Sequence, residues 1–488
     1  MNIRSILRIG GLGAAFCTAC FSTPGDDGTE TLETSSSATM GSTATTASTG
    51  TTDTTDTTNS ATSSPDMTTG SSTTLETTGN GSDSESTGGV PMPPATCDAL
   101  EAIPSEPGAH VAMIEALGPN SWLTLGPPAP DPEFGTAHGR SWGGQAFASA
   151  PALRGAFFTG EGAHAYVKAD GYAMDDVWFY DLNAHAWVVI HPGNHIASFN
   201  QRVMDGNLSI DANGQLQDIN GDPVPLHIAV HAWDFLTYNT VENRLAFSVG
   251  DGMGEYFMPG LETIQPGLDI LSAQREEVEI KSMSPWFYSV EDCRWERYPV
   301  ATKNPIPFGS KSTFVYAEAD ERYVHVGKDG AAVFDPVAKD WMVLQDTGTR
   351  PTGYDNGGVY DSKRNRIYMG RGVKGSGTLY VYDIDTNTWT QPASSGTGPI
   401  EFGPNSAGTL YDVANDLLVI FQFNDGLVYT WDPNTETWDS QAISDEVLTA
   451  TKYPQYNVFY DAPLNAYFVA VGSDSTDNLS MFAYRYAG

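Results

Sequence analysis

Leu379-Tyr-Val-Tyr-Asp-Ile-Asp-Thr-Asn-Thr-Trp389 contains an aromatic residue followed by an aspartate and, six positions after the aspartate, a tryptophan. The same spacing returns four more times. The copies are Tyr180-Asp181 to Trp187, Phe334-Asp335 to Trp341, Trp431-Asp432 to Trp438 and, with serine in place of aspartate, Tyr288-Ser289 to Trp295. A pattern that recurs at fixed spacing indicates a repeat architecture, so the repeat decides the fold before any single site does.

A second shared segment precedes these copies. It is clearest from Val359-Tyr360-Asp361 through Asn365 to Gly370, where an aromatic and β-branched run meets a polar turn and a second run. Close relatives run from Thr237 to Gly250, Leu410 to Phe421 and Phe459 to Gly472, and looser ones from Val315 to Gly327 and Phe157 to Val167. Apolar runs on both sides of an Asp- and Asn-rich turn predict a β-hairpin.

One repeat therefore has four short antiparallel strands: a hairpin, a third strand that ends in aromatic-Asp, and a fourth that opens with the tryptophan. Such a unit, repeated about every 45 to 50 residues, is typical of a propeller blade. We expect the aspartate to accept hydrogen bonds from turn amides. We expect the tryptophan to pack between blades rather than to contact a ligand.

The blade count depends on the two ends of the repeat region. The last repeat stops after its third strand, at 481–488, whereas Asn120-Ser121-Trp122 begins an isolated strand ahead of the first repeat. An N-terminal strand that completes the last blade would leave no open edge. We predict an all-β fold of six blades closed in this way, with seven blades as the alternative. The expected blades span 136–191, 227–300, 308–346, 353–394, 402–443, and 451–488 with 119–127.

These segments resemble the kelch repeat, a family of β-propellers, over nearly all of residues 119–488. The matching features are the Tyr-Asp-x3-Asn turns and the Asp-x5-Trp turns. The glycine pair that usually closes the second kelch strand is reduced here to single glycines such as Gly250, Gly327, Gly370 and Gly472. The chain is therefore described as kelch-like.

The first 96 residues do not fit the repeat. Residues 1–20 combine Arg4 and Arg8 with a short apolar run too short to span a membrane, which predicts an export signal. Its end, Cys17-Thr18-Ala19-Cys20, resembles a bacterial lipobox. That resemblance implies cleavage before Cys20, a lipid on Cys20, and a location at the outer membrane or cell surface. Simple signal cleavage is the alternative.

Residues 21–96 are nearly all Ser, Thr, Gly, Asp and Glu, without Lys or Arg. Such a segment has too little apolar surface to offset the entropy lost on folding, so we expect a disordered acidic stalk. The predicted domains are thus 1–20, 21–96 and a propeller over 97–488. Cys97 and Cys293 then remain in the exported chain, and two alternatives stay open for them: one disulfide, or two separate thiols.

The charge of the propeller region limits its partners. Ten of the 60 acidic residues lie in 21–96 and two of the 24 basic residues lie in 1–20, so residues 97–488 carry 50 acidic and 22 basic residues, a net charge of −28. This field repels phosphate backbones, which argues against nucleic acid. It favours neutral or cationic ligands, although solubility alone would also account for it.

Two insertions interrupt the repeat, from His191 to Val230 and from Asp251 to Ser284. Both belong to loops that leave one face of the ring, either before a first strand or between second and third strands. We predict that this face binds the ligand, since loops on a rigid scaffold usually carry recognition. The residues expected to ring its channel mouth are His231, Trp233, Lys311, Asp355, Asn356, Asn405 and Gln455. They suit a sugar or peptide ligand, and a merely water-filled pore is the alternative.

Four histidines, His191, His195, His227 and His231, flank the first insertion. The i, i+4 spacing would suit a metal on a helix, but Pro192 and Gly193 break such a helix, so zinc or copper remains the weaker interpretation. Asp251 to Glu255 and Asp383 to Asn387 lack the pattern of a calcium loop, and we interpret them as turns. No cofactor is predicted.

The sequence thus predicts an exported, lipid-anchored monomer that binds a protein or a carbohydrate through one propeller face and touches the membrane only through its anchor. The alternative is an enzyme, an oxidase, lyase or glycoside hydrolase acting at the channel mouth. Copper radical oxidases share kelch-type blades, but neither Cys97 nor Cys293 lies in a segment that matches their cysteine–tyrosine site. No Gly-x-Ser-x-Gly nucleophile motif is present.

Overall fold

The computed structural model describes residues 100–140, 146–159, 171–172, 176–211, 215–224, 235–248, 284–292, 294–301, 312–351, 357–370, 377–399, 407–450, 455–472 and 479–486. The chain divides into Met1–Ser82 and Asp83–Gly488, and every described residue belongs to the second unit. The predicted signal and the whole of the predicted stalk lie outside the described residues.

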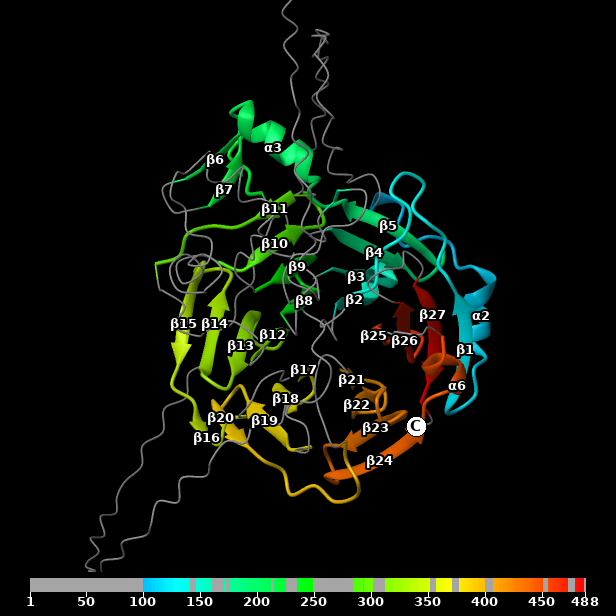
Figure 1. The fold of residues 1–488 in the computed structure, drawn as a ribbon. Coiled ribbons are helices and arrows are strands. Elements are labelled where there is room, and N and C mark those ends of the chain that lie inside the picture. Colours follow the sequence, from blue (N-terminus) through cyan, green and yellow to red (C-terminus); the bar gives the residue numbers. More distant parts are fainter. Residues whose placement is uncertain are drawn as a thin grey trace, which may run out of the picture. The chain divides into compact units, whose positions relative to one another are not determined.

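The described residues form six blades, each a sheet of four antiparallel strands (Figure 1). Blade 1 holds β2 (Phe147–Ala150), β3 (Gly155–Phe158), β4 (Val177–Asp181) and β5 (Ala186–His191). Blade 2 holds β8 (Leu236–Asn239), β9 (Arg244–Phe247), β10 (Trp286–Ser289) and β11 (Arg294–Glu296). Blade 3 holds β12 (Ser312–Ala317), β13 (Arg322–Gly327), β14 (Gly330–Asp335) and β15 (Asp340–Leu344).

The remaining blades follow the same order. Blade 4 holds β17 (Gly358–Asp361), β18 (Arg366–Gly370), β19 (Leu379–Asp383) and β20 (Thr388–Thr390). Blade 5 holds β21 (Ala407–Asp412), β22 (Leu417–Gln422), β23 (Leu427–Asp432) and β24 (Thr437–Ala442). Blade 6 holds β25 (Gln455–Asp461), β26 (Ala466–Gly472), β27 (Ser480–Arg485) and the N-terminal strand β1 (Ser121–Gly126).

The first strand of each blade lies innermost, and these strands contact one another in turn: β2, β8, β12, β17, β21, β25 and β2 again. The blades therefore form a closed ring, with the first strands nearest its centre (Figure 1). The predicted six-bladed propeller is confirmed, and the seven-bladed alternative is wrong.

The N-terminal strand closes the ring as the sequence predicts. β1 pairs antiparallel with β27, and Trp122 lies opposite Tyr484. This is the same cross-strand pair that the repeat makes elsewhere, for example between Tyr382 and Trp389. The Tyr484 hydroxyl donates a hydrogen bond to Asn120 Oδ1 at 3.1 Å, so the turn of this blade is assembled from two distant parts of the chain.

The spacing of the repeat follows from the geometry of its turns. Asp383 Oδ1 accepts a hydrogen bond from the Thr386 amide at 2.9 Å, and Asp335 Oδ1 accepts from the Val337 and Ala338 amides, both at 2.9 Å. Five residues after the aromatic residue the backbone is left-handed, with φ of 51°, 53°, 56° and 54° at His185, Lys339, Asn387 and Glu436. Asn120, at φ 50°, takes the same place in blade 6. The predicted turns are confirmed.

Neighbouring blades are held together by buried hydrophobic clusters. One such cluster lies at each of the six blade junctions. Each repeat tryptophan belongs to the cluster that its blade shares with the preceding blade; Trp389, for instance, packs with Val315 and Val333 of blade 3. The predicted role of the tryptophans in packing between blades is confirmed.

The expected hairpin of blade 1 is wrong. The sequence pattern suggested a hairpin from Phe157-Phe158 to Val167, whereas Phe157 and Phe158 end the second strand, β3. The first hairpin lies earlier, and its turn reads Ser149-Ala-Pro-Ala-Leu-Arg154 in place of Tyr-Asp-x3-Asn. The turn geometry is kept by Arg154 at φ 55°, but its sequence signature is missing.

Several connectors between blades also protect the outer sheet edges. In three blades, a backbone amide of the connector donates a hydrogen bond to the carbonyl of the turn residue just before the outermost strand. The donors are Ala129 in blade 1, Thr347 in blade 4 and Ser395 in blade 5. In blade 4 this connector is the short strand β16 (Thr347–Gly348), which pairs parallel with β20. Covering the outermost strand in this way lowers the risk of edge-to-edge association.

Short elements complete the unit: helix α2 (Ala109–Glu115), the 3-10 turn η1 (Pro151–Leu153), helix α3 (Ile196–Met204), the hairpin β6 (Leu208–Ile210) and β7 (Leu216–Asp218), and helix α6 (Asp445–Leu448). The segment before β1 crosses blades 1 and 2, because Leu100 packs in their shared cluster and Ser105 Oγ donates to Asp181 Oδ2 at 2.5 Å. Within the described residues, no helix combines the length and hydropathy needed to cross a bilayer.

Candidate functional site

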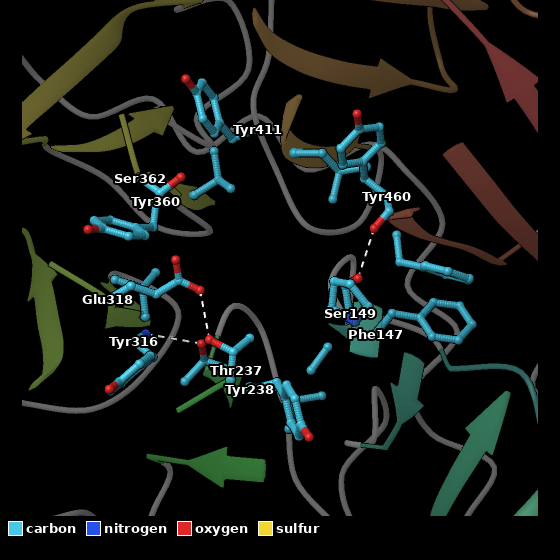
Figure 2. Close-up of a pocket in the computed structure, with 18 of the residues that line it drawn as sticks. Phe147, Ser149, Thr237, Tyr238, Tyr316, Glu318, Tyr360, Ser362, Tyr411 and Tyr460 are labelled. Carbon is cyan, nitrogen blue, oxygen red and sulfur yellow. Dashed lines mark hydrogen bonds between the residues drawn. The ribbon is translucent and has the colours of Figure 1, made fainter. Parts of the chain in front are cut away.

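The central channel widens into a cavity of about 280 Å³ at the end where each first strand leads into its hairpin turn. Figure 2 shows side chains from the six innermost strands around this space. The lining residues are Phe147, Ala148, Ser149 and Pro151 of blade 1; Leu236, Thr237, Tyr238 and Thr240 of blade 2; Phe314, Val315, Tyr316 and Glu318 of blade 3; Gly358, Val359, Tyr360 and Ser362 of blade 4; Leu410, Tyr411 and Val413 of blade 5; and Phe459, Tyr460 and Ala462 of blade 6.

Tyrosines occupy one equivalent position in five of the six first strands, and Ser149 occupies it in blade 1. In blades 2, 4, 5 and 6 the tyrosine hydroxyl holds the hairpin turn. Tyr360 donates to Asn365 Oδ1 at 3.1 Å, Tyr411 to Asp416 Oδ1 at 2.6 Å and Tyr460 to Asn465 Oδ1 at 3.0 Å. The turns already use these three hydroxyls. The three tyrosines therefore shape the wall of the cavity but offer a ligand few hydrogen-bonding groups.

The backbone of the first strands adds polar groups to the wall. The Tyr316 amide donates to Thr237 Oγ1 of the neighbouring blade at 3.1 Å, and the Tyr460 carbonyl accepts from Ser149 Oγ at 2.8 Å. These peptide groups point away from their own sheets, as the free edge of an innermost strand must. The channel wall therefore alternates apolar side chains with peptide groups.

Thr240, Glu318 and Ser362 lie at the rim, each directly after a first strand. Thr240 Oγ1 donates to Glu318 Oε1 at 2.9 Å, so the carboxylate is held beside the opening (Figure 2). Among the described residues that line the cavity, Glu318 is the only one with a formal charge. The rim is therefore negative on the side of blades 2 and 3.

The nearby arginines do not offset this charge, because carboxylates bind them. Arg154 Nη1 contacts Asp461 Oδ1 at 2.8 Å, and Arg364 contacts Asp361 and Asp416 at 2.9 and 2.6 Å. The hydrogen bond from Arg364 holds the pKa of Asp416 well below its usual range. The Arg154–Asp461 pair joins blade 1 to blade 6, and the Arg364–Asp416 pair joins blade 4 to blade 5. Both pairs therefore stabilise contacts between neighbouring blades.

Most residues predicted to ring the other mouth lie outside the described residues. They are His231, Trp233, Lys311, Asp355, Asn356 and Asn405; Gln455 is described only as the first residue of β25. Six of the seven precede first strands and Gln455 begins one, whereas the described cavity lies where those strands end. The predicted binding face therefore stays a prediction. The first insertion contributes α3, β6 and β7, and most of the second, through residue 283, lies outside the described residues.

The structure describes two of the four histidines that flank the first insertion, His191 and His195. His195 caps helix α3, where its Nδ1 accepts from the Ser198 amide at 3.4 Å. His191 ends β5, and burial lowers its pKa to about 4, although Asp176 raises it. His227 and His231 lie outside the described residues. The described residues contain no group of three or more His, Cys, Asp or Glu side chains placed to hold a metal ion.

The cysteines Cys20, Cys97 and Cys293 also lie outside the described residues. The rim residues Thr240, Glu318 and Ser362 were not predicted as a site. A positional signal was present, since each follows the Tyr-Asp, Tyr-Asn or Tyr-Ala pair of a first strand. That position looked like ordinary turn sequence, and only the ring geometry brings the three turns to one opening.

Comparison with known proteins does not add a family. No protein-family model matches the chain, and no curated protein shows significant sequence similarity to it. The function therefore has to be inferred from the geometry of the channel.

Proposed function

We propose that this protein is a binding protein that takes one group of a protein or carbohydrate ligand into the central channel of a kelch-like propeller. The observation that supports the proposal is the cavity of about 280 Å³, to which all six blades contribute. Its mixture of apolar walls, peptide groups and a few rim side chains is typical of ligand sites, although its volume lies just below their usual range of about 300–1,000 Å³.

A rigid scaffold supports the same proposal. Blade junctions are filled by aromatic and aliphatic side chains, and the rim positions are held by hydrogen bonds such as Tyr360 to Asn365. A preformed site loses less conformational entropy when a ligand binds than a site that must first become ordered. The ring thus presents the cavity in a fixed shape.

The test compares a variant that obstructs the opening with one that does not. Ser362 is exposed at the rim, whereas Val337 is 90% exposed on an outer turn. The full chain would be screened on a glycan array and a peptide array, and each hit measured with Ser362→Trp and Val337→Trp. We expect Ser362→Trp to abolish binding and Val337→Trp to keep it. Equal binding by both variants would show that the ligand does not enter this cavity.

We also propose that the protein is exported and held at the outer membrane or cell surface by a lipid on Cys20, with residues 21–96 as a stalk and the propeller acting as a monomer. The lipobox-like end of the signal supports this arrangement. Metabolic labelling with a radioactive fatty acid should mark the wild-type protein and not Cys20→Ser. Labelling that survives in Cys20→Ser would rule out the anchor without bearing on the cavity.

A further inference from the structure

We infer that the group received by the channel cavity is a primary alkyl ammonium, a chain of methylenes ending in a cation, as in a lysine side chain or an aliphatic amine. This inference rests on the proposed function, since it names the chemistry of the same cavity. Three observations support it: the apolar lining of the cavity, the carboxylate of Glu318 at the rim, and the ion pairs that Arg154 and Arg364 form with aspartates.

The walls suit methylenes better than hydroxyls. Leu236, Val359, Leu410 and Phe459 are among the lining residues, and the tyrosine hydroxyls of blades 4 to 6 are used by their turns. A sugar ring in this space would lose hydrogen bonds to water that the engaged hydroxyls of Tyr360, Tyr411 and Tyr460 do not replace, which is costly. An aliphatic stem gains from the same apolar surface.

The rim supplies the charge. Glu318 is exposed, and its Oε1 accepts only one side-chain hydrogen bond among those described, from Thr240. A carboxylate has lone pairs for several donors, so an ammonium at the opening can bind to it while part of its shell remains water. Long cationic side chains commonly take this arrangement, with an apolar stem buried and the charged head at the surface.

The surrounding charges strengthen the field at this point. Glu242 and Glu321 lie on the turns of blades 2 and 3, and with Glu318 they add to the effect of burial in raising the pKa of Tyr316 to about 12. On the neighbouring blades 1 and 4, Arg154 and Arg364 are paired with Asp461 and Asp416. The propeller region as a whole carries a net charge of −28, which favours the approach of cations.

The first test uses matched probes on the full chain. Pentylamine would be compared with pentan-1-ol, which has the same stem without the charge, by isothermal titration calorimetry near neutral pH. A peptide with one lysine between glycines would be compared with its acetyl-lysine form. We expect the amine and the lysine peptide to bind and their neutral counterparts to bind at least about tenfold more weakly, the size of a charge-assisted hydrogen bond.

Variants locate the binding. Glu318→Gln keeps the shape and an acceptor for Thr240 but removes the charge, and should weaken binding of pentylamine by about tenfold. Glu115→Gln removes the same charge from an exposed position on α2, outside the residues that line the cavity, and should leave the affinity unchanged. Thr240→Lys places a cation beside Glu318 within the chain and should also reduce binding. Circular dichroism would verify that each variant is folded.

The results distinguish a lysine of a protein partner from a free amine, and they test the amine inference separately from the proposed binding function. Tighter binding of the lysine peptide than of pentylamine would identify a protein partner, and the reverse would identify a free amine; either result supports the alkyl ammonium. Equal affinity for charged and neutral probes, or no effect of Glu318→Gln, would overturn the inference. A glycan that binds and is blocked by Ser362→Trp, with no amine binding, would overturn it while leaving the proposed binding function standing.

Discussion

Asn365 adopts a backbone conformation that most residues avoid, with φ of 51°, and uses its side chain to hold three partners. Its Oδ1 accepts from Tyr360, and its Nδ2 donates to Asp320 at 3.0 Å and to Asp385 at 2.6 Å. One residue thus fixes the hairpin turn of blade 4, reaches blade 3 and reaches the second turn of its own blade.

Substitution at Asn365 separates the backbone contribution from the side-chain contribution. Asn365→Gly keeps the left-handed conformation and loses the hydrogen bonds, so the free energy of unfolding should fall by about 1 kcal/mol. Asn365→Ala loses both and should cost about 2 kcal/mol. Urea denaturation followed by tryptophan fluorescence measures the difference. If glycine destabilises as much as alanine, the left-handed backbone is not the reason for this asparagine.

His325 predicts a dependence of stability on pH. Burial lowers its pKa to about 3, while the same group in the unfolded chain titrates near its ordinary pKa of 6.5. Between these values the unfolded chain binds a proton that the folded chain does not, so the free energy of unfolding should fall as pH drops below about 6.5. The slope from this residue approaches about 1.4 kcal/mol per pH unit.

The measurement is urea denaturation at about pH 8 and about pH 5 for the wild type and His325→Gln. At the higher pH both states carry neutral histidine, so any difference there reports lost packing and the lost bond between His325 Nε2 and Ser312 Oγ. The change in stability between the two pH values should be smaller in the variant. An unchanged pH dependence would contradict a proton linked to His325.

Individual residues show where sequence interpretation succeeds. Asn365, Asp383 and Trp389 were predictable because the repeat presents each of them several times in one register. Arg154 was not, because it takes the left-handed position in blade 1 without any asparagine or aspartate to mark it. The hairpin of that blade was consequently misplaced, since backbone geometry can persist where the residues that usually favour it are absent.

At the scale of elements, β1 is the strand on which closure of the ring depends. An in-frame deletion of residues 119–127 would expose the edge of β27, whose backbone groups β1 otherwise pairs. We expect the deleted chain to unfold at lower urea concentration and to self-associate, as detected by light scattering after gel filtration. A synthetic peptide of residues 119–127, added in trans, should restore the monomer.

Trp122→Ala serves as the control for that deletion. The variant keeps the strand and loses only the contact of Trp122 with Tyr484 and Phe421, so it should be destabilised but remain monomeric. A deletion that behaves like the wild type, or a peptide that binds the intact protein equally well, would show that β1 is not required for closure.

The segment before β1 bears on the two cysteines. Leu100 packs in the same cluster as Trp295, at the junction of blades 1 and 2. Cys97 and Cys293 lie three and two positions before these residues, and three residues span at most about 10 Å. We therefore predict that Cys97 and Cys293 form a disulfide when the protein folds under oxidising conditions.

Peptide mapping under non-reducing conditions should show the linked Cys97 and Cys293 peptides, and Cys293→Ser should lower the free energy of unfolding by about 2–5 kcal/mol. The Cys97→Ser, Cys293→Ser double variant should be no less stable than either single variant. Two free thiols in the protein folded under oxidising conditions would mean that the cysteines do not pair.

At the scale of the whole molecule, the excess of acidic residues predicts a response to salt. The net charge of −28 over residues 97–488 makes most carboxylates repel one another, and compaction increases that repulsion. Raising the ionic strength from about 0.01 M to about 0.1 M shortens the screening length from about 30 Å to about 10 Å. The melting temperature in calorimetry should rise over this range; a fall would mean that ion pairs such as Arg364–Asp416 outweigh the general repulsion.

The architecture as a whole was readable from the sequence, whereas the cavity was not. Six blades follow from a periodic pattern, and the closing strand follows from an unpaired repeat. The cavity depends on which turns converge at one mouth. Residues such as Thr240 and Glu318 are 78 positions apart and share only their position after a first strand, which looks like ordinary turn sequence. Convergence of this kind is a property of the closed ring and cannot be read from any one repeat.

The divided turn between Tyr484 and Asn120 also constrains the order in which the protein can form. The two residues are 364 positions apart, so β1 leaves the ribosome long before its partner exists. Contacts of such sequence separation form late and slowly, because a long loop must close before they are made. Every other blade can pair its strands as they emerge, but blade 6 has to wait for β27. We therefore expect β1 to stay unpaired during that interval, and its pairing with β27 to be the late step that converts a row of blades into a ring.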